Sequence, residues 1–167
     1  MKNYQTSEIK NVVLLGAPGS GKTTFAEAMA FEGKVIDRRG SIENENTLSD
    51  NTDLEHSNRR SIYSTILYTE FMNHKLNIID APGSDDFSGG LFAAFKVADV
   101  GLMLFNAQNG FEVGSEIQSR YAKTYNVPLV GVINQLDSEK ANWEGTLESI
   151  ASFSKVKPIV VQYPVCL

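Results

Sequence analysis

Residues 16–23 read Gly-Ala-Pro-Gly-Ser-Gly-Lys-Thr, which matches the pattern G-x-x-x-x-G-K-[ST] in full. A short apolar run at residues 11–15 precedes the pattern, and a helical spacing of apolar residues at 23–31 follows it. Glycines in this setting let the backbone curl so that successive N–H groups face phosphate oxygens, and the helix N-terminus adds the positive end of its dipole. The feature restricts the chain to folds in which a strand runs through a phosphate-binding loop into a helix.

Two side chains at the end of this loop have a clear chemical use. Lys22 can reach the β- and γ-phosphates of a nucleotide, and the hydroxyl of Thr23 can ligate Mg²⁺. The pattern by itself does not separate ATP from GTP. The residues expected to contact nucleotide here are Gly16, Ala17, Pro18, Gly19, Ser20, Gly21, Lys22, Thr23 and Thr24.

The rest of the chain alternates short apolar runs with helical patterns, which predicts an α/β fold of the P-loop NTPase type. We expect three layers, with a mostly parallel sheet between helices and one antiparallel strand in a hairpin turning at 72–73. Ligands bind such sheets at the carboxyl ends of the strands. Strands are expected at 11–15, 62–71, 75–80, 100–105, 128–134 and 157–165. Helices are expected at 23–31, 91–97, 112–125 and 143–153.

The segment from about 37 to 61 is polar, with scattered apolar residues. Such a stretch buries too little apolar surface to offset the entropy of ordering it, so we expect a mobile loop. Long loops inside compact domains are usually functional or disordered.

Asp80-Ala81-Pro82-Gly83 ends the apolar strand that is expected at 75–80. An Asp at a strand tip beside a phosphate-binding loop is placed to hold Mg²⁺, directly or through water. Gly83 would let its amide approach a γ-phosphate, which a side chain would obstruct. A simple Pro-Gly turn after a buried strand is the competing interpretation.

Asn134-Gln135-Leu136-Asp137 follows the strand expected at 128–134. GTPases read guanine with N-K-x-D at this place, because the Asp carboxylate accepts hydrogen bonds from guanine N1–H and the N2 amino group, which adenine cannot offer. Asn134 and Asp137 are present, and Gln135 stands where the lysine is expected. This order of motifs favours guanine, with reduced affinity, over adenine.

Length and charge bound the remaining possibilities. The chain has 167 residues, enough for one domain, and a net charge of −5, which excludes an indiscriminate nucleic-acid binder driven by phosphate attraction. Its longest apolar runs are too short to span a membrane, and a single cysteine permits no intrachain disulfide. We expect a cytoplasmic, membrane-independent and monomeric domain.

In combination, these motifs resemble elongation factor G-like translational GTPases along nearly the whole chain. The matching segments are 11–16, 19–24, 74–83, 110–116 and 158–164. The resemblance implies a GTP-binding (G) domain, spanning 1–167, that uses GTP, GDP and Mg²⁺ and serves translocation on the ribosome, docking on ribosomal RNA through the full-length protein. It also implies a first switch at about 37–61 and a second at about 80–90. The family's later guanine contact is missing before Leu167, so we expect a C-terminally truncated domain.

Three departures from the family pattern fall at the site. Ser84 stands where the family has a catalytic histidine that positions the attacking water, and Gly83 and Lys22 are the other expected catalytic residues. Ser61 is the candidate for the Mg²⁺-ligating threonine of the first switch, which would complete a metal set with Thr23 and Asp80. Gln135 is the third departure. Because positioning and electrostatics supply most of the catalysis in phosphoryl transfer, Ser84 predicts slow hydrolysis unless Asp85 or the ribosome compensates.

Two functions therefore stay open. The first is a translational GTPase that couples hydrolysis to work on the ribosome. The second is a GTP-dependent ribosome-binding module whose hydrolysis is weak or lost. A P-loop ATPase or kinase is disfavoured by Asn134 and Asp137.

Overall fold

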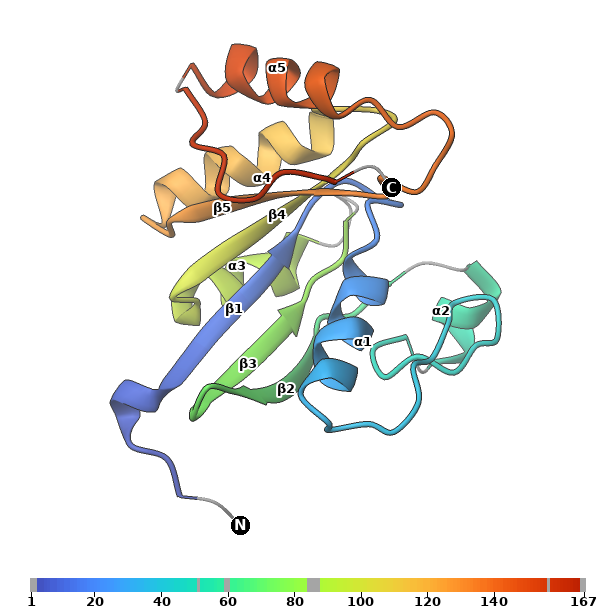
Figure 1. The fold of residues 1–167 in the computed structure, drawn as a ribbon. Coiled ribbons are helices and arrows are strands. Elements are labelled where there is room, and N and C mark those ends of the chain that lie inside the picture. Colours follow the sequence, from blue (N-terminus) through green and yellow to red (C-terminus); the bar gives the residue numbers. More distant parts are fainter. Residues whose placement is uncertain (1–2, 51, 59–60, 84–87, 156, 166–167) are drawn as a thin grey trace.

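The computed structural model describes residues 3–50, 52–58, 61–83, 88–155 and 157–165, which form a central sheet with helices on both sides (Figure 1). The strands are β1 (Ile9–Leu15), β2 (Thr65–Phe71), β3 (His74–Asp80), β4 (Val100–Asn106) and β5 (Leu129–Asn134). The helices are α1 (Lys22–Glu32), α2 (Asp53–Asn58), α3 (Ser88–Val97), α4 (Val113–Thr124) and α5 (Trp143–Ser154), with a 3₁₀ turn at Thr6–Glu8. Within the described ranges, no helix combines the length and apolarity needed to cross a membrane.

The sheet has the strand order β2-β3-β1-β4-β5. Strand β1 pairs in parallel with both β3 and β4, and β4 pairs in parallel with β5. Among these five strands only β2 runs antiparallel, against β3. The expected α/β fold with a mostly parallel sheet and one antiparallel hairpin is therefore confirmed.

The register of the parallel strands aligns their carboxyl ends. Leu14 of β1 lies opposite Asp80 of β3, and Asn106 of β4 lies opposite Asn134 of β5. Since the loops after parallel strands leave one edge of the sheet, the motifs that follow β1, β3 and β5 gather at that edge.

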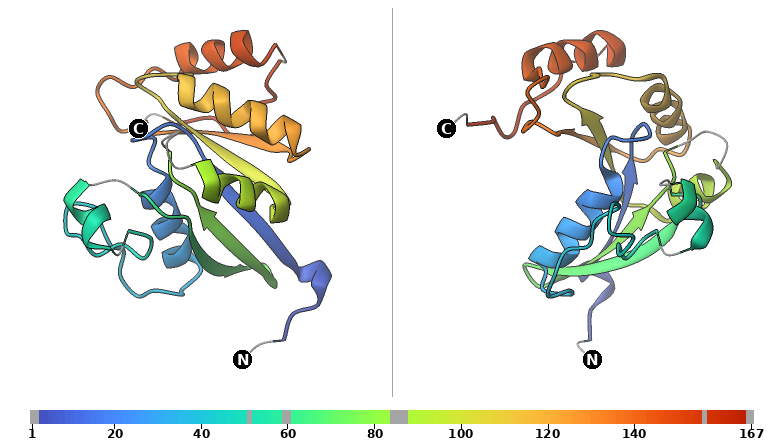
Figure 2. Two further views of the ribbon diagram at one scale, coloured as in Figure 1. Left: turned by 180° about the vertical axis from the view of Figure 1, so that it is seen from behind. Right: turned by 90° about the vertical axis from the view of Figure 1, so that its right-hand side faces the viewer.

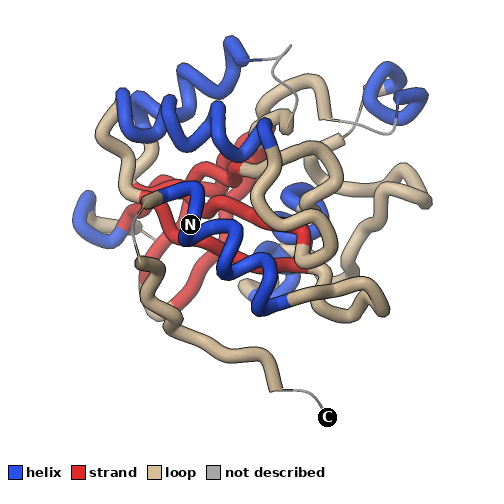
Figure 3. The backbone as a smooth tube through the Cα atoms, turned by 90° about the horizontal axis from the view of Figure 1, so that it is seen from above, coloured by secondary structure: helices blue, strands red, loops and turns tan. Residues whose placement is uncertain are grey.

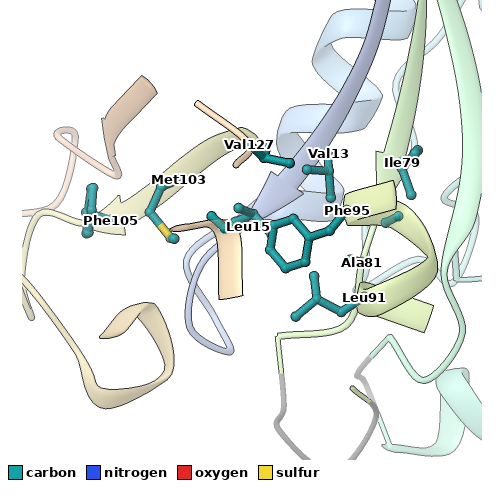
Figure 4. Close-up of a cluster of buried hydrophobic side chains, with 11 residues drawn as sticks. Val13, Leu15, Ile79, Ala81, Leu91, Phe95, Met103, Phe105 and Val127 are labelled. Carbon is teal, nitrogen blue, oxygen red and sulfur yellow. The ribbon is translucent and has the colours of Figure 1, made fainter. Parts of the chain in front are cut away.

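Helices cover both faces of the sheet (Figure 2). Two apolar clusters, one on each face, hold these layers together. Alternate residues of β1 point to opposite faces, as the period of a strand requires. Val13 and Leu15 pack with α3 and α4, including Phe95, in the cluster drawn in Figure 4. Val12 and Leu14 pack instead against Ala26 of α1. Figure 3 shows the strands enclosed between these helices.

The hairpin between β2 and β3 turns at Met72 and Asn73, as the sequence predicts. Both residues have positive φ, 46° and 62°, which is the backbone pattern of the turns that fit the right-handed twist of paired strands. Asn tolerates this conformation well, whereas Met does so rarely.

The polar segment at 37–61 differs from the loop expected there. It contains helix α2 and buries Thr47, Ser49, Asp50 and Glu55. Polar side chains alone predict a solvated loop, but here the Thr47 and Glu55 side chains make hydrogen bonds inside the protein. Strand β2 begins at Thr65 rather than at residue 62. The N–H groups of residues 62 and 63 donate to Glu55 Oε1 at 3.0 and 3.1 Å, so they are not available to a strand partner.

The strand expected at 157–165 is wrong. Those residues are described and contain no strand, and Ile159, Val161 and Val165 are 90%, 87% and 83% exposed. An alternating apolar pattern indicates a strand only where a sheet edge receives it, which local sequence does not determine. As a result β5 is an edge strand, with Leu129 and Val130 exposed, rather than the buried strand expected at 128–134.

Leu14 offers a test of the core that lies beneath the phosphate-binding loop. Its side chain is fully buried, so Leu14→Ala should lower the free energy of unfolding by about 2–5 kcal/mol through lost transfer energy and a residual cavity. Urea denaturation followed by circular dichroism measures the change. Leu54→Ala on α2, where the side chain is 55% exposed, is the matched control. Equal losses for the two variants would contradict this difference in burial.

Candidate nucleotide-binding site

The loop between β1 and α1 has the backbone geometry that its glycines permit. Gly16, Gly19 and Gly21 all have positive φ, and Gly21 caps the N-terminus of α1. A Cβ on Gly16 would clash with the carbonyl oxygen of Leu104, so no larger residue fits there. The loop therefore presents its amides and the N-terminal end of α1 to one edge of the sheet, as an anion site requires. Within it Ala17 is buried, whereas Pro18 and Thr24 are exposed.

A buried glutamine on α4 fixes the start of this loop. The N–H of Gly16 donates to Gln118 Oε1 at 2.7 Å, and Gln118 is 2% exposed. This contact was missed in the sequence, because a glutamine in a helical pattern gives no signal of which backbone group it meets.

Lys22 folds back over the loop that it follows. Its Nζ donates to the carbonyl oxygens of Gly16 and Ala17 at 2.9 and 3.0 Å. Burial lowers the Lys22 pKa to about 8, although the charges of Asp80, Asp50 and Glu112 oppose this change. A buried ammonium held by two neutral carbonyls is well placed to receive phosphate oxygens, which bind a cation more strongly.

The structure brings the three expected metal-binding residues together. Thr23 Oγ1 donates to Asp80 Oδ2 at 2.9 Å and lies 3.2 Å from Ser61 Oγ. The three side chains come from α1, the end of β3 and the segment before β2. Their proximity agrees with the assignment of Ser61, and the metal role itself stays a prediction.

Two further polar residues that sequence reasoning missed join this cluster. Asp50 is 6% exposed and Ser49 is 2% exposed, and both come from the polar segment before α2. Burial raises the Asp50 pKa, the Ser61 hydroxyl opposes the rise, and the charge of Glu55 adds to it. Nothing in the residue pattern marks Asp50, because the segment contains several acidic residues with similar neighbours.

Asp80 is even more deeply buried. Burial raises its pKa, and the hydroxyl of Thr23 and the Lys22 ammonium oppose the rise, while the charge of Asp50 reinforces it. Asp50 and Asp80 thus lie close enough to repel one another. When both are ionised, the Asp50 and Asp80 carboxylates together carry one more negative charge than the Lys22 ammonium can balance. A bound cation would balance this buried charge.

The donor set fits Mg²⁺. Asp80 Oδ1, Asp50 Oδ1 and Ser49 Oγ are buried and have no hydrogen-bond partner among the described residues. Together with Thr23 and Ser61, they offer only carboxylate and hydroxyl oxygens, which are the ligands that Mg²⁺ prefers.

Gly83 brings the end of the β3 loop against the phosphate-binding loop. A Cβ there would lie 2.5 Å from Lys22 Nζ and 2.9 Å from the backbone nitrogen of Pro18. The glycine is therefore required by the close approach of two backbones. Ser84, expected at the position of the family histidine, lies outside the described residues, as does part of the expected second switch at 80–90.

The loop after β5 is tied to the phosphate-binding loop by two side-chain amides. Asn134 Nδ2 donates to the carbonyl oxygen of Ser20 at 2.9 Å, and Gln135 Nε2 donates to that of Gly19 at 2.8 Å. Gln135 takes a left-handed conformation with φ of 60°. Asp137 is exposed in the same loop. The residue that departs from the family pattern thus makes a structural contact of its own.

This chain is similar to known proteins. A family model described as the elongation factor Tu GTP binding domain matches residues 7–163. Elongation factor G of Dehalococcoides mccartyi is 32% identical over 164 residues, which cover 98% of this chain and 24% of that protein. The elongation factor G-like protein of Mycobacterium tuberculosis is 32% identical over 153 residues, which cover 90% of this chain and 21% of that one.

A crystal structure of a protein from Thermus thermophilus has the same fold, with a TM-score of 0.83 and 32% sequence identity over 87% of this chain and 22% of that chain. The chain thus spans less than a quarter of the length of these relatives. The expected resemblance to elongation factor G-like GTPases is confirmed. Since the family model covers nearly all of the chain, this protein belongs to the elongation factor Tu GTP-binding domain family.

Proposed function

We propose that this domain binds GTP and GDP with Mg²⁺ and hydrolyses GTP as the nucleotide-binding part of an elongation factor G-like protein that acts in ribosomal translocation. The observation that carries the proposal is the cluster of Thr23, Asp80 and Ser61 beside the phosphate-binding loop, with buried oxygens still open to a cation. The cluster joins three segments that are distant in sequence. Such convergence beside a phosphate-binding loop suits a magnesium-bound nucleotide.

Each side chain has a specific part in this proposal. The ammonium of Lys22 and those amides of the loop at 16–23 that are not bonded within the protein bind the phosphates, and Thr23, Asp80 and Ser61, with Asp50 nearby, hold the cation. Bound Mg²⁺ would neutralise charge that develops on the phosphate oxygens. Gly83 lies against Lys22, where its amide can approach a γ-phosphate. Segments 37–61 and 80–90 are proposed to respond to the nucleotide as the two switches.

Guanine is the proposed base. Asn134 and Gln135 hold the loop after β5 against the phosphate-binding loop, which supports a role in base recognition for Asp137 of the same loop. A carboxylate there accepts from guanine N1–H and the N2 amino group, and adenine leaves it unpaired.

Partners and location follow from relatives rather than from this domain. The relatives are named elongation factor G and elongation factor G-like protein. We include the ribosome and its RNA as partners of the whole protein, a cytoplasmic location, and a monomeric domain in the proposal.

The alternative is a GTP-dependent ribosome-binding module with weak or lost hydrolysis. It is favoured by Ser84, because serine is shorter than the family histidine and cannot become a cation. Under this alternative, GTP orders the switch segments and turnover is incidental.

Asp137 tests the choice of base. Asp137→Ala should weaken GDP binding about 10- to 100-fold, because two hydrogen bonds to a charged acceptor are lost. Titration with a fluorescent guanine nucleotide and Mg²⁺, in competition with unlabelled ATP, measures the effect. Glu139→Gln, in an exposed position of the same loop, should leave binding unchanged. The guanine assignment fails if ATP displaces the label from the wild-type protein as well as GTP does.

Ser84 distinguishes the two functions. If hydrolysis is weak because the histidine is missing, Ser84→His in the full-length protein should raise ribosome-stimulated GTP hydrolysis about tenfold or more. Phosphate release in single-turnover mixtures with ribosomes measures the rate. Ser7→His, an exposed change before β1, is the control. A fast wild-type rate that Ser84→His leaves unchanged would support the translational GTPase and contradict the binding module.

A further inference from the structure

Glu27 is a buried acidic residue on α1 that the proposed contacts with nucleotide do not use. Its side chain is 1% exposed, although acidic residues are rarely buried without partners. Glu27 lies one helical turn after Thr23, and residues four apart occupy the same face of a helix. The helix that carries the metal-binding hydroxyl therefore carries a buried carboxylate on the same side.

The partners of Glu27 are backbone amides of the polar segment. Its Oε2 accepts from the N–H of Gly40 at 3.0 Å, and its Oε1 accepts from the N–H of Leu48. Between these two residues the chain folds into a closed turn, in which the N–H of Ser41 donates to Asn46 Oδ1 at 2.8 Å. A Cβ on Gly40 would clash with the carbonyl oxygen of Asn46, so the turn is tight. One carboxylate thus holds both ends of the turn at 40–48.

The end of this turn leads directly into the candidate metal site. Leu48 is followed by Ser49 and Asp50, whose side-chain oxygens Oγ and Oδ1 are buried without a partner among the described residues. The hydroxyl of Thr65 donates to the carbonyl oxygen of Ser49 at 3.1 Å, which holds the same stretch from β2. The position of the Leu48 amide therefore determines where the Asp50 carboxylate can lie.

A second buried carboxylate holds the other end of the segment. Glu55 is 1% exposed, and its Oε1 accepts from the N–H groups of Ile62 and Tyr63, which directly follow Ser61. Its Oε2 accepts from the Thr52 hydroxyl at 2.8 Å. Glu27 and Glu55 thus bracket Asp50 and Ser61 from the two sides.

We propose that Glu27 is a positioning residue that holds the segment at 40–48 against α1 and so keeps Asp50 beside Thr23 and Asp80 to receive the magnesium ion of a bound nucleotide. Glu55 does the same for Ser61. This inference rests on the proposed binding of a magnesium nucleotide. The two glutamates are expected to affect the part of the GDP affinity that depends on Mg²⁺. The part that depends on phosphate contacts alone belongs to the loop at 16–23.

The isosteric change Glu27→Gln separates these two contributions. A glutamine has nearly the same shape, but its NH₂ group would face one of the two donating amides, so one tether is lost and an amide donor is left unpaired. The phosphate-binding loop keeps all of its contacts. The GDP dissociation constant in EDTA should therefore stay within about twofold of the wild type, while the tightening produced by Mg²⁺ should shrink about tenfold or more.

The experiment measures the GDP dissociation constant with excess EDTA and with saturating Mg²⁺ for four proteins: the wild type, Glu27→Gln, Glu55→Gln and Glu32→Gln. The two buffers have the same ionic strength, so that electrostatic screening is equal in both. Glu32 lies at the exposed end of the same helix and is the matched control. Amide hydrogen exchange of the nucleotide-free proteins follows residues 40–50 directly. Exchange there should be faster in Glu27→Gln and unchanged in Glu32→Gln, and circular dichroism verifies that each variant is folded.

The outcomes separate the inference from the proposed function. Faster exchange at 40–50 with a reduced magnesium effect supports it. Faster exchange with an unchanged magnesium effect would show that Glu27 is only a structural tether, and would overturn the inference. Equal weakening of GDP binding in EDTA and in Mg²⁺ would also overturn it. If Glu27→Gln does not fold, Glu55→Gln decides by the same comparison. Wild-type protein that binds no GDP in either buffer would overturn the proposed function, and the inference with it.

Discussion

The parallel pairing of β1 with β3 determines where the polar groups of the site can lie. Its register sets Leu14 opposite Asp80, so the carboxylate emerges beside the strand that leads into the phosphate-binding loop. The loop then returns the chain as α1, whose first turn brings Thr23 within 2.9 Å of that carboxylate. A shift of one residue would turn Asp80 to the opposite face of the sheet, and the cluster could not form. Such a shift would also exchange the β1 side chains between the two apolar clusters.

The site concentrates charge in places where water cannot reach it. Burial lowers the pKa of Lys22 to about 8 and raises the pKa values of Asp50 and Asp80. Each shift favours the neutral form, which means that each charge is insufficiently compensated by the protein alone. A polyanion near the ammonium and a divalent cation near the carboxylates would restore both kinds of compensation at once. If the domain binds a magnesium nucleotide as proposed, this arrangement favours the binding of phosphate and metal together.

The fold and the chemically active residues could be predicted where the information is local. The loop at 16–23, Asp80 and Asn134 follow from short patterns beside apolar strands, and Ser61 follows only from the resemblance to the family's first switch. Asp50, Glu27 and Gln118 could not be found in this way. Gln118 meets Gly16 from 102 residues away, and such a contact depends on how helices and strands pack after they form. The strand expected at 157–165 was wrong for a related reason, since pairing requires a second segment that the local pattern does not contain.

The ties from Asn134 and Gln135 to the phosphate-binding loop have a consequence for the dimensions of the pocket. Both donors are uncharged amides, so they neither titrate near neutral pH nor attract counterions. A lysine in place of Gln135 would carry a charge that salt screens. The two hydrogen bonds that hold the loops together therefore depend little on salt or pH. Salt and pH therefore act on the charged groups of the site rather than on these two hydrogen bonds.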